Sequence, residues 1–442
     1  MKWWALALCP IIIGPTFAEE PGGLRSSLVI GGGFVMDDNP DFQTVPDSSV
    51  DPFVELRFGL TSETRRQSFE ANGALDLRGG TVEKGKAALI YSIASSQSKL
   101  TAGLELDRLS SGGFEGTLET AVDEQPADLV AIAPRGSDMT NGAAWLTFQD
   151  GLQRSVGYEL DLRHGIRRFS DQGQNGNVDR SEAQAALVLR FSQLTEGRVE
   201  IGQSLSETAA PFSQSLRNTY AQVGLRHQID RSTSLSFGLG HRRIRGDRSG
   251  RQLARSGAEL TFGLQREMRD RRLYADVSVR QQVIGKRATA RIGYERAGKA
   301  AKLSAWIGAT HFSGGQSDLI GGLSYVQQND TGKVEIVMDR TVGIDASSED
   351  SRITDRLGLN WQSQLSANGS LNLRADYVRV GATAAGPARQ GAGAKAVYRH
   401  ALRSDWGVQV ALRYRVRQDG AGPKVSSRSM FLTLETQFEA LH

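Results

Sequence analysis

The chain has 442 residues, with 53 basic and 49 acidic side chains, a formal net charge of +4 and one cysteine. So small a net charge, without interleaved aromatic and basic residues, argues against a nucleic-acid binder. The cysteine is Cys9, so the chain beyond it can form no disulfide and no thiolate metal site.

The first 18 residues have the pattern of a secretory signal peptide. Lys2 precedes an apolar run from Trp3 to Phe17, and the small residue Ala18 stands before two glutamates. Two prolines interrupt the run, which is shorter than the roughly 20 residues that a membrane-spanning helix needs. The pattern predicts cleavage after Ala18 and a mature chain of residues 19–442.

From residue 24 onward, apolar and polar residues alternate in segments separated by turn residues. One segment alternates Val156, Tyr158, Leu160 and Leu162 with Gly157, Glu159, Asp161 and Arg163. Side chains of a strand point alternately to its two faces, and repeated segments of this kind are typical of outer-membrane barrels. The sequence therefore predicts an all-β fold: one transmembrane antiparallel up-and-down barrel of about 22 strands, with 18 to 22 compatible with the pattern, in the outer membrane of a Gram-negative bacterium.

The expected connectors alternate between short and long. Asp230 to Ser232 is a short one, whereas Ser110 to Met139 and His241 to Arg251 are longer and more polar. Short periplasmic turns and long outer loops are usual in such barrels. The acidic loop from Ser110 to Met139 could fold inward as a constriction or lie exposed. Only Glu19 to Gly23 separate the signal from the first strand, so we expect no plug domain.

Arginines dominate the polar faces, and the last hairpin, Ser404 to Glu439, is the clearest case. The arginines expected to face the lumen and contact a ligand are Arg399, Arg413, Arg415, Arg417, Arg374, Arg291 and Arg280. A guanidinium group binds carboxylates or phosphates through two parallel hydrogen bonds. These side chains could form a pathway for an anionic solute or polymer. They could also form cross-strand ion pairs that stiffen the wall, and the near balance of charges favours the pairs.

A second group of arginines is expected in an outer loop at the barrel mouth: Arg242, Arg243 and Arg245, together with Arg248, Arg251 and Arg255. A local positive field could gather an acidic polymer there. Contact with the phosphates of surface lipid, or simple solvation, is the favoured alternative. The expected partners are outer-membrane lipids and lipopolysaccharide, the barrel-assembly machinery and a polysaccharide; no nucleic acid is expected.

Sites for metals, cofactors or catalysis are weak in this sequence. The stretch Asp37 to Asp41 offers oxygen ligands, but its spacing fits an acidic turn better than a calcium loop. His311 and Ser313 have the His-x-Ser spacing of outer-membrane lipid A deacylases, but no orienting acid can be assigned. We therefore predict no cofactor, no metal and no enzymatic activity.

The stretch Val29 to Pro40 resembles the opening of the beta-barrel porin 2 family, in which a glycine-rich first strand runs into an Asp-Asp-Asn-Pro turn. The resemblance implies an outer-membrane barrel, in a family with members tied to export of extracellular polysaccharide. The chain departs from the usual barrel ending, because four residues follow Phe438, where an aromatic residue is normally last.

Two classes of function remain at this point. The first is a porin-like channel, for export of exopolysaccharide or passage of anionic solutes. The second is a blocked structural or surface-binding barrel that acts through its outer loops, with a lipid-modifying enzyme as a less favoured alternative. Ion conductance separates the two classes, because a blocked barrel passes little current.

Overall fold

The computed structural model describes residues 23–40, 44, 46–109, 138–170, 177–209, 213–248, 251–283, 285–345, 350–382, 387–403 and 405–441. No helix in these ranges is long and apolar enough to cross a membrane. The described strands are β1 (Leu24–Asp37), β2 (Ser49–Glu63), β3 (Gln67–Arg78), β4 (Thr81–Ala94), β5 (Ser98–Leu109), β6 (Met139–Asp150), β7 (Val156–Phe169), β8 (Val178–Arg190), β9 (Thr195–Thr208), β10 (Gln214–Gln228), β11 (Thr233–Arg248), β12 (Arg251–Met268), β13 (Arg271–Gln282), β14 (Gly285–Ala297), β15 (Ala301–Phe312), β16 (Ser317–Asn329), β17 (Gly332–Asp345), β18 (Asp350–Gln364), β19 (Gly369–Val380), β20 (Arg389–Ala401), β21 (Trp406–Asp419) and β22 (Val425–Leu441).

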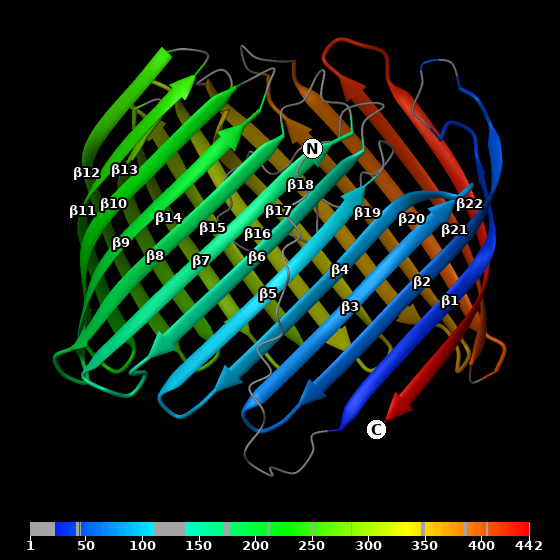
Figure 1. Cartoon of the computed structure of the whole chain (residues 1–442), viewed down its shortest axis with the longest axis horizontal. Coiled ribbons are helices and arrows are strands. Elements are labelled where there is room, and N and C mark those ends of the chain that lie inside the picture. The colour runs from blue at the N-terminus through cyan, green and yellow to red at the C-terminus, as the bar shows by residue number, and fades with distance from the viewer. Residues whose placement is uncertain are drawn as a thin grey trace, which may run out of the picture.

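The strands form one closed sheet. Each pairs antiparallel with its neighbours in sequence, and β1 pairs with β22 from Arg25 opposite Leu441 to Asp37 opposite Ser429. Figure 1 shows the strands running obliquely around the barrel. Closure leaves no free sheet edge, which a lipid environment requires. The predicted up-and-down barrel of about 22 strands is confirmed.

The outer surface of the barrel is apolar. On β22, Leu432 and Phe438 are each 52% exposed, whereas Phe431 and Thr433 on the other face are buried. Large aliphatic and aromatic side chains are exposed in this way on strands all around the barrel. So extensive an apolar surface is compatible with lipid and not with water. The chain is therefore an outer-membrane barrel of the Gram-negative type.

The connectors at one end of the barrel are all short. Residue 24, where β1 begins, and the C-terminal end of β22 lie at the same end, together with ten turns of two to five residues, which is the periplasmic arrangement. At the other end, β3 and β4 are joined by only Gly79 and Gly80, whose φ angles of 57° and 83° suit a tight turn. The predicted signal peptide, and the acidic loop apart from its last two residues, lie outside the described residues.

The prediction of an outer loop around Arg242, Arg243 and Arg245 is wrong. β11 continues to Arg248 and β12 begins at Arg251, so all three arginines lie on a strand. Alternation turns Arg242 inward and Arg243 and Arg245 outward. The end of this strand extends beyond the apolar, lipid-facing band and carries charged residues. Its sequence is therefore as polar as that of a loop, which explains the wrong prediction.

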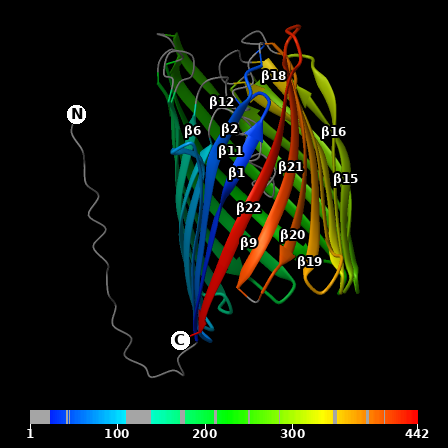
Figure 2. The ribbon, with the colours of Figure 1, turned by 90° about the vertical axis from the view of Figure 1, so that its right-hand side faces the viewer.

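The narrow side of the barrel is formed by β21, β22, β1 and β2, which face the viewer in Figure 2. Inside it, Val35, Phe53, Ala411 and Phe431 form a buried apolar cluster. The rings of Phe53 and Phe431 meet edge to face, with centroids 5.7 Å apart. This small core sits directly beside the polar residues described next.

Candidate functional site

The polar face of the last hairpin points into the barrel, as its alternation predicts. The side chains of Arg413, Arg415 and Arg417 are 9%, 5% and 8% exposed. In the β21–β22 register, Arg413 lies opposite Ser429 and Arg415 opposite Ser427. These guanidinium groups are therefore packed against their own wall.

Asp37, at the end of β1, joins this group from the far end of the sequence. Its carboxylate accepts hydrogen bonds from Ser427 Oγ at 2.9 Å and Ser429 Oγ at 2.8 Å. Its Oδ2 atom lies 3.3 Å from Arg78 Nη1, 3.5 Å from Arg415 Nη2 and 3.7 Å from Arg413 Nη2.

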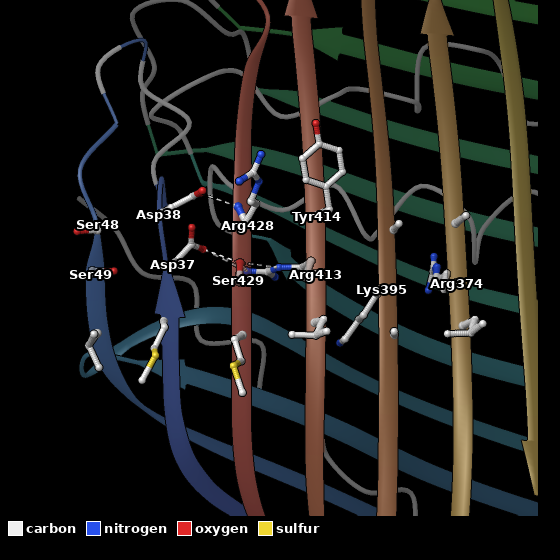
Figure 3. A pocket seen from close by; sticks show the side chains of 18 of the residues that line it. Asp37, Asp38, Ser48, Ser49, Arg374, Lys395, Arg413, Tyr414, Arg428 and Ser429 are labelled. Carbon is white, nitrogen blue, oxygen red and sulfur yellow. Dashed lines mark hydrogen bonds and ion pairs between the residues drawn. The ribbon is translucent and has the colours of Figure 1, made fainter. Parts of the chain in front are cut away.

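We call this group of six residues, Asp37, Arg78, Arg413, Arg415, Ser427 and Ser429, the clasp; Figure 3 shows Asp37 directed towards Ser429 and Arg413. The Asp37 side chain has no exposed surface. A buried carboxylate requires such partners, so the clasp is a structural unit that joins β1 to the last hairpin, β21 and β22, where the sheet closes.

Three other predicted lumenal arginines also lie beside carboxylates. Arg399 pairs with Glu435. Arg374 Nε lies 3.9 Å from Asp376, and Arg291 Nε lies 3.1 Å from Asp276. Arg291 also covers the ring of Trp306 at 5.6 Å. Charge on these parts of the lumen wall is thus largely balanced within the wall.

The lumen wall of β11 to β14 is different. Near its outer end it carries four arginines, Arg242, Arg255, Arg280 and Arg287, which we call the basic arc. Arg242 pairs with buried Glu259 and covers the ring of Tyr220 at 4.7 Å. The charge of Arg242 is therefore neutralised by Glu259.

Two further members of the basic arc, Arg255 and Arg280, leave positive charge in the lumen. Arg255 is exposed and lies opposite inward-facing Ile244. Arg280 is exposed and lies directly opposite Arg287, which donates a hydrogen bond from Nε to Thr310 Oγ1 at 2.8 Å. Within the described ranges, neither Arg255 nor Arg280 contacts a carboxylate. Like charges directly opposite each other repel, so an anion between them would be stabilised.

Sequence reasoning identified Arg280 and Arg242 as site candidates but missed the arc. It assigned Arg255 to a loop and passed over Arg287. The alternation of residues could have revealed the strand, because it continues through β12 without a turn. The inward face of β12 carries Arg251, Leu253, Arg255, Gly257 and Glu259.

A hollow of about 790 Å³ lies in the wall next to the clasp. Its borders include the outward-facing Met36, Leu412 and Met430, and three alanines, Ala375, Ala394 and Ala396. Figure 3 shows this stretch of wall with the far side of the barrel behind it. The hollow belongs to the lipid side and not to the lumen.

His311, Ser313 and Asp37, the sequence candidates for catalysis or metal binding, each contact other residues of the barrel. His311 Nδ1 lies 2.8 Å from Ser317 Oγ, whereas Ser313 Oγ accepts a hydrogen bond from the Lys286 amide at 3.0 Å. His311 and Ser313 are therefore engaged with other partners. Asp37 belongs to the clasp, and the described residues contain no group of three side chains that could hold a metal ion.

No protein-family model and no curated protein matches the chain. The similarity between Val29 to Pro40 and the beta-barrel porin 2 family thus has no further support.

Solved structures do match. The ferric-catecholate import receptor Fiu of E. coli K12 aligns with a TM-score of 0.57 and 12% identity, over 95% of this chain and 82% of that one. The FrpB iron transporter of Neisseria meningitidis aligns with a TM-score of 0.55 and 10% identity, over 95% and 83%. At this identity the likeness shows a shared fold, that of a large outer-membrane β-barrel.

Proposed function

We propose that this protein passes anionic solutes across the outer membrane, and that the basic arc selects for their charge. The observation that carries the proposal is the exposure of Arg255 and Arg280 in the lumen, where neither contacts a carboxylate within the described residues, with Arg287 directly opposite Arg280. A cleft lined by one sign of charge raises the local concentration of the opposite ion. The barrels with the same fold, named as an iron transporter and a ferric-catecholate import receptor, support transport as the class of function.

The clasp arginines have a different role in this proposal. Arg413 and Arg415 already contact Asp37, so they hold the wall together instead of contacting the solute. Extracellular polysaccharide is the cargo suggested by the sequence resemblance, and an acidic one would meet the same basic arc as a small anion. No catalytic step is part of the proposal.

Ion selectivity in a planar bilayer tests the proposal. Purified protein is inserted under a KCl gradient, and the reversal potential gives the ratio of anion to cation permeability. The wild-type barrel is expected to prefer chloride, and an acidic oligosaccharide is expected to reduce the current. The variant R255Q/R280Q/R287Q removes three charges and is expected to lose most of the preference.

The matched control is D276N/R291Q, which removes one lumenal ion pair without changing the net charge. It is expected to retain the wild-type reversal potential. A folded barrel that passes no current, or one whose selectivity is the same in the triple variant, would overturn the proposal. The first result would favour the blocked, surface-binding barrel.

A further inference from the structure

Three arginines lie side by side on the outer, lipid-facing surface of β10 and β11. Arg217 faces Arg245 directly across the two strands, and Arg243 is the next outward residue below Arg245. All three are exposed. We call them the outer arginine patch. Within the described ranges none of them makes a side-chain hydrogen bond or an ion pair.

The patch lies where the apolar band ends. Below it on the same face of β11 are Leu235, Phe237 and Leu239, the last two being 47% and 55% exposed. Arg245 lies ten positions beyond Leu235, which is about 33 Å along a strand and about 23 Å of height at a tilt of 45°. An outer-membrane apolar band is about 25 Å tall. The patch therefore lies at the headgroup level, at the end of the barrel opposite the termini.

The nearest acidic side chains on this face lie farther out. Asp247 on β11 and Glu207 on β9 are both opposite Ser215, one outward position beyond Arg217 and Arg245. Elsewhere on the outer face, Arg340 forms an ion pair with Asp355, with Nη2 and Oδ2 3.1 Å apart. The three patch arginines have no such carboxylate, although directly opposed like charges destabilise a sheet.

We propose that the outer arginine patch binds the phosphate groups of a phosphorylated glycolipid of the outer leaflet, of the lipid A class. Guanidinium groups bind phosphate oxygens in pairs, and the repulsion between Arg217 and Arg245 is relieved by an anion between them. The acyl chains of the same lipid lie along Leu239 and Phe237. The site faces lipid and is independent of the lumenal passage, so either proposal can fail alone.

Lipid retention measured by native mass spectrometry tests this site. Wild-type barrel in a neutral detergent is titrated with purified bis-phosphorylated lipid A. It is expected to retain one lipid per barrel after gentle removal of detergent. The variant R217Q/R243Q/R245Q is expected to bind about 100-fold more weakly, since each arginine near a charged lipid surface contributes about 1 kcal/mol.

Two controls separate the phosphates from other causes. R340Q removes an outward arginine that already has a carboxylate partner, and it is expected to bind lipid A as the wild type does. The wild-type barrel is expected to bind dephosphorylated lipid A as weakly as the triple variant binds bis-phosphorylated lipid A. Inorganic phosphate at equal concentration is expected not to displace the lipid. Equal retention by the triple variant, by dephosphorylated lipid or in the presence of competing phosphate would overturn the proposal. Heat-modified migration on a gel confirms that each variant is folded.

Discussion

Arg413 on β21 and Glu83 on β4 contact each other inside the barrel, with Nη2 and Oε1 3.4 Å apart. Their strands are not neighbours, since β22, β1, β2 and β3 lie between them. Two side chains can meet across four intervening strands only where the wall bends sharply. The contact shows that the wall bends sharply at the strands where the barrel closes, next to the clasp.

Replacing Asp37 by Asn is expected to destabilise the barrel by about 3 kcal/mol, because breaking a buried ion pair leaves its partner charges uncompensated. The three arginines around Asp37 would lose their common carboxylate. Urea unfolding in lipid vesicles measures the change. Glu335→Gln is the control, since its pair with Lys333 is about one-third exposed and contributes less than about 1 kcal/mol. Equal effects of the two variants would contradict a structural clasp.

Arg415→Gln and Arg280→Gln are expected to change different properties of the barrel, its stability in the first case and its ion selectivity in the second. Arg415 is buried and close to Asp37, so its loss is expected to lower stability and leave the reversal potential nearly unchanged. Arg280 is exposed in the lumen, so its loss is expected to shift the reversal potential while stability changes by less than about 0.5 kcal/mol. Both variants are measured in both assays. A large change of ion selectivity in Arg415→Gln would show that the clasp contacts the permeating solute.

Gly33→Ala is expected to impair closure of the barrel, whereas Gly32→Ala is expected to be tolerated. A Cβ at residue 33 would lie 1.8 Å from the Leu432 carbonyl oxygen on β22, but one at residue 32 would meet nothing within 4 Å. Overpacking of this kind typically costs 1–3 kcal/mol, about the range expected for Gly33→Ala. The temperature at which the folded gel band is lost gives the comparison. Similar temperatures for both variants would show that the β1–β22 pairing can shift to make room.

The periplasmic turn between β10 and β11 is expected to lose stability in strong acid. Asp230 accepts hydrogen bonds from the Ser232 hydroxyl and from the amides of Ser232 and Thr233, and the hydroxyl of Ser232 is the main cause that lowers the pKa of Asp230 from 3.8 to about 2.

A lowered pKa in the folded state means that the stabilisation by Asp230 is complete above pH 3.8 and is lost as the pH falls towards 2. Asp230→Asn is therefore expected to be less stable than wild type at pH 6 and nearly equal to it at pH 2. Hydrogen exchange of the Ser232 and Thr233 amides at both pH values measures this. An unchanged difference at pH 2 would mean that the carboxylate charge is not responsible.

The strands could be predicted from local alternation, and so could the direction of Arg413, Arg415 and Arg417. The partners of these arginines could not. Asp37 lies 392 residues from Ser429, and no local pattern relates the two. The basic arc was missed for a different reason: charged residues beyond the lipid band resemble a loop, and only the β11–β12 register shows that Arg255 faces the lumen.

The register between β1 and β22 has a consequence for how the chain becomes a ring. Before the two edges meet, Asp37 on one edge has Arg78 of β3 as its only arginine partner in the clasp, while the guanidinium groups of Arg413 and Arg415 lie near the other edge. These opposite charges attract across the gap, and they are matched only when Asp37 reaches Ser429. A slip of one residue would turn Asp37 towards lipid, so electrostatic attraction favours a single way of joining the first strand to the last.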